Sequence, residues 1–115
     1  MSILDTNTVD FIGTLAEQDL VVLSIADHLE WGEGLTNEHL LLLQEKINTY
    51  LRYIESGEIY TSFPSARGKN LAVRVYFKHE PPHEAQAFIQ SAAHILQGGG
   101  VGLETVVEPE RGPAH

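Results

Sequence analysis

The chain contains no cysteine, which excludes disulfides, thiolate metal sites, iron–sulfur clusters and cysteine nucleophiles. Basic residues are scarce: 7 Lys and Arg stand against 16 Asp and Glu, and the formal net charge of −9 would repel a phosphate backbone. No apolar stretch approaches the ~20 residues needed to cross a bilayer, and residues 1–7 lack the basic start and apolar core of a signal peptide. These absences predict a water-soluble, cytoplasmic protein that binds neither nucleic acid nor membrane.

The size and composition that remain are those of one globular domain. The chain has 115 residues, of which 43% are apolar and 20% are charged. We expect this domain to span residues 1–107. The last residues, 108–115, include two prolines and a glycine, and we expect them to form a disordered tail.

Hydrophobic periodicity predicts six elements in the order strand, strand, helix, strand, helix, strand. The strands are expected at residues 9–14, 19–26, 71–78 and 101–107, and the helices at 37–56 and from Pro81 and Pro82 to the glycines at 98–100. The first two strands should form a hairpin, with the second in a central position because it is apolar on both faces. Thr36 is the predicted N-cap of the first helix, and Gly57 should end it in the left-handed conformation. Residues 58–69 fit either a covering loop or a short edge strand.

Each predicted helix has a single apolar side, so both helices can lie on one face of a four-stranded mixed sheet. The fold class expected is therefore α+β, a two-layer α/β sandwich of order ββαβαβ. The order of the strands within the sheet stays open. The outer face is left to solvent or a partner, and Arg74 and Lys78 should emerge there, opposite Asp10 or Glu104 on neighbouring strands.

The segment from His79 to His83 matches the zinc-peptidase pattern H-E-x-x-H letter for letter. That pattern needs both histidines on one helical turn, and Pro81 and Pro82 between them deny this geometry. The triple glycine follows a helix instead of a strand, which is the wrong order for a phosphate-binding loop, and no G-x-S-x-G elbow exists. These motifs therefore predict no catalytic residue, no metal site and no cofactor.

The best candidate binding region follows the central strand. It holds Asp27, His28, Glu30 and Trp31, and His39 at the start of the next helix can converge on it. A carboxylate beside an imidazole can orient a general base or help hold a metal ion. One hypothesis is thus a small-molecule site or enzyme using Asp27, His28 and Glu30, with Trp31 as a pocket wall; another is a divalent-metal site of His28, Glu30 and His39.

A purely structural use of this region is an alternative interpretation. In it Asp27 caps the amides of the loop, and Trp31 packs against the helix with its indole N–H bonded. His28 and Glu30 then point to water. Perturbed carboxylate and histidine pairs are common in structural networks as well as in active sites.

Leu42 and Tyr53 lie opposite the apolar stripe of the first predicted helix, with Lys46 and Thr49 between them. We expect them to form an interface patch that a partner or a second copy would cover. Scattered exposed apolar residues are also ordinary, and the segment 58–69 could fold back over them.

Four strings give the chain a resemblance to a known family. They are VDFIG at 9–13, DHLEW at 27–31, LQEKINTYL at 43–51 and ESG at 55–57. With these strings, the region from Val9 to Gly98 resembles a family of small, mostly bacterial, cytoplasmic domains that have no assigned function. The resemblance implies no activity.

The hypothesis that fits best is a non-enzymatic protein-interaction module: a small acidic α/β domain that binds another protein or a second copy of itself. The contact would use the outer sheet face or the side of Leu42 and Tyr53. The strong negative charge favours a basic partner.

Overall fold

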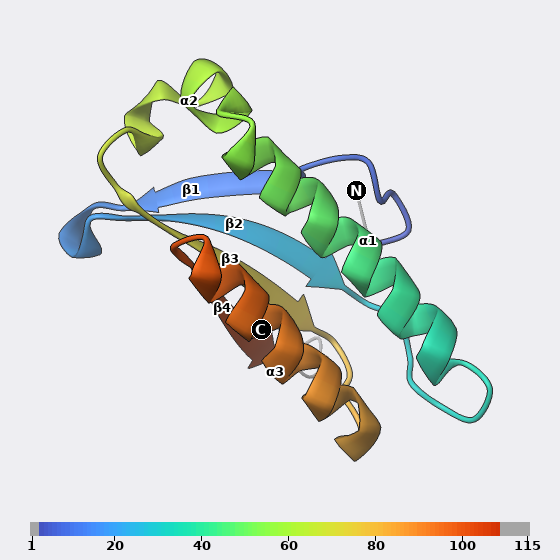
Figure 1. The fold of residues 1–115 in the computed structure, drawn as a ribbon. Helices are drawn as coiled ribbons and strands as arrows, with labels where there is room; N and C mark the ends of the chain where they lie inside the picture. The colour runs from blue at the N-terminus through green and yellow to red at the C-terminus, as the bar shows by residue number, and fades with distance from the viewer. Residues whose placement is uncertain (1–2, 109–115) are drawn as a thin grey trace, which may run out of the picture.

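The computed structural model describes residues 3–108 (Figure 1). Its main elements, in chain order, are β1 (Phe11–Leu15), β2 (Leu20–Asp27), α1 (Thr36–Glu55), α2 (Glu58–Ser62), β3 (Asn70–Phe77), α3 (His83–Gly98) and β4 (Val101–Val107). Short 3-10 turns, η1 and η2, occupy Ala16–Gln18 and Pro64–Ala66. The predicted order ββαβαβ is confirmed, with α2 as an added short helix. None of the helices within residues 3–108 is long and apolar enough to span a membrane.

The four strands form one mixed sheet in the order β1-β2-β3-β4. β1 runs antiparallel to β2 in a hairpin, and β2, β3 and β4 are parallel to one another. Parallel neighbours need crossover connections, and right-handed crossovers put successive helices on the same face of the sheet. Figure 1 accordingly shows α1 and α3 together on one face. The predicted two-layer α/β sandwich is confirmed.

The core lies between this face and the helices. Strand β2 is central, as predicted, and even Val22 on its outer face is only 6% exposed. Alternate side chains of β2 and β3 point toward the helices, because successive strand residues face opposite sides. The main buried contributors are Val21, Leu23, Ile25, Leu71, Val73, Val75 and Phe77 from the sheet, with Leu43, Ile47, Tyr50, Ile54 and Leu96 from the helices.

Three local expectations meet different outcomes. Gly57 has a φ of 83°, the predicted left-handed end of α1. Thr36 is not the N-cap: it is the first residue of α1, and its hydroxyl donates to the carbonyl of Gly32 at 3.2 Å. Residues 58–69 form α2 and a 3-10 turn, so the edge-strand alternative is wrong.

At the C-terminal end, most of the predicted tail (residues 109–115) lies outside the described residues. Glu108 is described, and its backbone N–H donates to the carbonyl of Phe77 at 2.7 Å.

On the outer face, Arg74 lies 2.7 Å from Glu104, the opposite charge expected for it on β4. Asp10 plays no part in this face. Its side chain is 1% exposed and pairs with Lys46 beneath the helix layer, with 2.9 Å between Nζ and Oδ2.

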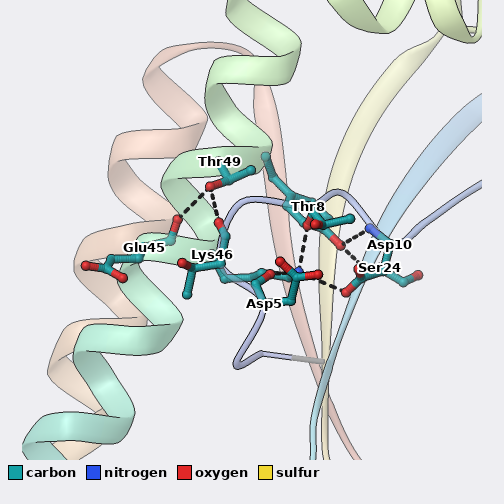
Figure 2. A network of polar contacts seen from close by, with 9 residues as sticks. Asp5, Thr8, Asp10, Ser24, Glu45, Lys46 and Thr49 are labelled. Carbon is teal, nitrogen blue, oxygen red and sulfur yellow. Dashed lines mark hydrogen bonds and ion pairs between the residues drawn. The ribbon is translucent and has the colours of Figure 1, made fainter. Parts of the chain in front are cut away.

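Lys46 is completely buried and fastens the N-terminal segment, residues 3–10, to α1 (Figure 2). Its Nζ donates to the carbonyl oxygens of Asp5 and Thr8, each at 2.6 Å. One turn along, the hydroxyl of Thr49 donates to the carbonyl of Thr6. The 2.9 Å contact with Asp10 lacks hydrogen-bond geometry, so Lys46 compensates this buried carboxylate through its charge.

Tyr50 extends the attachment to the sheet. Its hydroxyl donates to the carbonyl of Ser24 at 2.6 Å and accepts from the backbone N–H of Asp10 at 3.0 Å. Burial raises the pKa of Tyr50 to about 12, with the charge of Asp10 adding to the shift and backbone N–H groups opposing it. The phenol therefore stays protonated and keeps its donor.

We expect Lys46→Met to destabilise the protein by about 3–5 kcal/mol, because it leaves the carboxylate of Asp10 buried without a counter-charge. Lys69→Met is the matched control: its ammonium group also lies 2.9 Å from a carboxylate, that of Asp19, but the two side chains are 31% and 62% exposed. An exposed pair contributes about 0–1 kcal/mol. Urea denaturation of both variants measures the difference, and equal losses would contradict the role of burial.

Candidate functional site

Asp27 and His39 form a buried pair at the end of the sheet where β2 delivers the chain to α1. Each residue is 2% exposed. His39 Nε2 lies 2.5 Å from Asp27 Oδ2, and Asp27 Oδ1 accepts the backbone N–H of Leu29 at 3.1 Å. Asp27 is the last residue of β2 and His39 lies in the first turn of α1, so the short intervening loop brings them together.

The second nitrogen of His39 is also bonded. Nδ1 lies 3.2 Å from the carbonyl oxygen of Glu30, and since a carbonyl only accepts, Nδ1 must carry the proton. Nε2, the other ring nitrogen, faces the carboxyl group of Asp27, so both nitrogens of His39 have partners within the protein. Neither nitrogen of this imidazole is free to take a proton from a substrate or to bind a metal ion.

Trp31 packs against one side of the Asp27–His39 pair. Its ring stacks on that of His39, with the centroids 3.6 Å apart and the planes 14° from parallel. The indole N–H donates to the carbonyl of His79 at 3.2 Å, just beyond β3. Trp31 thus ties the β2–α1 loop to the β3–α3 loop.

Burial raises the pKa of Asp27 above its ordinary value, because an ionised carboxylate loses hydration there. The hydrogen bond and charge of His39, and the amide of Leu29, oppose this effect without cancelling it. The net effect is a carboxyl group at Asp27 that keeps its proton to a higher pH than in the unfolded chain.

The remaining predicted binding residues, His28 and Glu30, are exposed. Both line an open hollow of about 420 Å³ together with Glu38, one edge of His39 and Leu35. Trp31 lines a neighbouring hollow instead, and Asp27 lines neither of these. Within residues 3–108 no group of three or more His, Asp or Glu side chains is close enough to hold a metal ion, so His28, Glu30 and His39 do not form a ligand set.

The side of α1 with Leu42 and Tyr53 matches the alternative in which the segment 58–69 folds back over it. Both residues are half-buried and pack against the core, and the hydroxyl of Tyr53 lies 2.5 Å from Ser62 Oγ of α2. The N-terminal segment covers Lys46 and Thr49 between them.

The outer face of the sheet carries a hollow, and Arg74 is the one of its lining residues that the sequence places on this face. It has a volume of about 520 Å³ and no helix over it. Its members share small size or apolar character, with one cation: Phe11, Gly13, Leu15, Val22, Ser24, Ala26, Arg74 and Tyr76 are among them. The signal was present in the alternation of Phe11, Gly13 and Leu15 along one strand.

Comparison with known proteins shows which protein family the chain belongs to. The model of a family of unknown function, DUF6572, matches residues 1–109. The chain belongs to DUF6572. This confirms the resemblance to a small domain family without an assigned function. Searches of curated proteins and of solved structures give no match. Membership in DUF6572 brings no activity with it, so function must be argued from this chain's own geometry.

The raised pKa of Asp27 predicts a pH dependence that Asp27→Asn removes. Above pH 3.8 the unfolded chain loses this proton first and the folded chain keeps it, so stability falls as pH rises through the folded-state pKa. We expect the free energy of unfolding of the wild type, minus that of Asp27→Asn, to decrease from pH 4 upward, about 1.4 kcal/mol per unit of pKa shift. Urea titrations across this range measure it. A difference that stays constant or grows with pH would contradict the prediction.

Proposed function

We propose that this DUF6572 domain binds another protein through the outer face of its sheet and catalyses no reaction. The observation that carries the proposal is the hollow on that face, which the two-layer architecture leaves without a helix. An amphipathic layer normally buries its apolar side against another layer. In this fold the helices cover one face of the sheet, and no layer of the described residues packs on the other face.

The chemistry of the face suits a protein partner. Phe11 is 49% exposed and Leu15 is 37% exposed, and both stand on the outer side of β1. Between them and Tyr76 lie the small residues Gly13 and Ala26, which let a convex element of a partner approach the sheet. Exposed aromatic and aliphatic groups around a recess are typical of interface anchors.

The charges on this face favour an apolar partner surface over a basic one. Arg74 is neutralised by Glu104, which lies outside the hollow, and Glu108 is the one acidic residue in its lining. Acidic groups lie instead around the two hollows described at the candidate site. Glu33 and Glu84 line the hollow that contains Trp31, and Glu30 lines the hollow that contains His28. The net negative charge then acts at long range to disfavour anionic partners.

The buried pair supports the absence of catalysis. The imidazole of His39 has both nitrogens bonded within the protein, and Asp27 is 2% exposed. A general base must reach the proton it removes. The absence of cysteine, with the resemblance to bacterial cytoplasmic domains, supports a reducing compartment as the setting.

Site-specific photo-cross-linking tests the proposal. A photoreactive phenylalanine analogue at position 11 of the full chain, exposed to native cell extract, should give a discrete protein adduct. The same analogue at Leu41 on α1, which is 55% exposed, is the matched control and should give none. Equal labelling from both positions, or none from position 11, would overturn the proposal. The mass of the adduct separates a second copy of the chain from a different protein.

A further inference from the structure

We propose that one partner is a second copy of the chain, joined along the free edge of β1 so that two sheets become one. This rests on the proposed function, because the joined sheets continue the same outer face. It goes further by naming the partner and the symmetry axis.

The edge of β1 is open for such pairing. Within residues 3–108, β2 is the only strand hydrogen-bonded to β1, and four of the five β1 residues are exposed. Natural proteins protect edge strands with charges, prolines, bulges or covering segments. The sequence Phe-Ile-Gly-Thr-Leu has no charge and no proline, and all five residues pair with β2 in continuous register. Short length is its one protective feature.

The strand is complementary to itself about Gly13. In an antiparallel pair with a two-fold axis at Gly13, Phe11 lies opposite Leu15 of the second copy, and Ile12 lies opposite Thr14. This register pairs every residue of β1 and keeps outer-face residues against outer-face residues. Aromatic and aliphatic groups then meet across the strands, a pairing that stabilises sheets.

The inner side of the edge offers further packing space. A hollow of about 590 Å³ lies beside β1, lined among others by Val9, Ile12, Arg52 and Tyr53. Ile12 and Thr14 of the second copy would enter it from across the axis. Tyr53, half-buried within its own chain, would thereby contribute to an interface.

Charge also selects this edge. The exposed anion nearest to β1 in sequence is Glu17, and it lies beyond the end of the strand, in the 3-10 turn Ala16–Gln18. The opposite edge, β4, carries Glu104 within the strand. Because two acidic chains repel each other, the association should strengthen as salt is added, whereas binding to a basic partner would weaken.

The test uses the proposed two-fold axis, which places residue 13 of one copy opposite residue 13 of the other. A Cβ added at Gly13 meets no atom within 4 Å in the single chain, and the position faces open space, so Gly13→Lys and Gly13→Glu should both fold. Across the two-fold axis each variant faces its own charge. We expect light scattering over a concentration series to give the mass of two chains for the wild type, and a dissociation constant raised severalfold or more for each variant. An equimolar mixture of the two should recover the mass of two chains, because Lys then faces Glu.

Leu41→Lys is the control, since it adds the same charge at an exposed site on α1, and it should behave as the wild type. Circular dichroism verifies that each variant is folded. A wild type that stays a single chain throughout, a Gly13→Lys variant that keeps the wild-type constant, or a mixture that does not recover would overturn the pairing. If position 11 still cross-links to a different protein in that case, the pairing fails and the proposed function stands.

Discussion

The buried ammonium group of Lys46 determines which surfaces of this protein are free. It holds the carbonyls of Asp5 and Thr8 and the carboxylate of Asp10, and so lays the N-terminal segment along α1. That segment takes up the side of the helix that periodicity alone leaves without a neighbour. The outer sheet face and the edge of β1 are among the surfaces that stay uncovered, and the functional argument rests on these two.

Much of the architecture follows from local pattern. Alternation in β3 and one-sided helices are enough to predict the strands, the helices and their common face, because each pattern has only one way to bury its apolar groups. The attachment of the N-terminal segment does not follow, since Lys46 meets a carbonyl 41 positions earlier in the chain. A lysine among polar neighbours is indistinguishable, in sequence, from a solvated one. Thr36 misleads for a local reason: a turn from Gly32 to Leu35 already begins the helical path, with 3.0 Å between the Leu35 nitrogen and the Gly32 oxygen.

The sequence predicts which residues of the candidate site lie close together, but it does not predict which way their side chains point. Asp27 and His39 flank one short loop, so the sequence favours their proximity. Whether an imidazole presents a nitrogen to solvent depends on what its other nitrogen meets, and here that is the backbone of Glu30. Chain geometry in the loop decides this contact, and no side-chain pattern encodes it. For the same reason, His28 and Glu30 reach an open hollow while Asp27 lies buried.

The stacking of Trp31 on His39 has a spectroscopic consequence. The chain has a single tryptophan, so its entire indole emission arises from one loop, pressed against an imidazole and hydrogen-bonded to the start of another loop. Intrinsic fluorescence therefore reads the integrity of this corner and not an average over the molecule. A ligand, a partner or a change of pH that disturbs the corner can be followed without any attached dye.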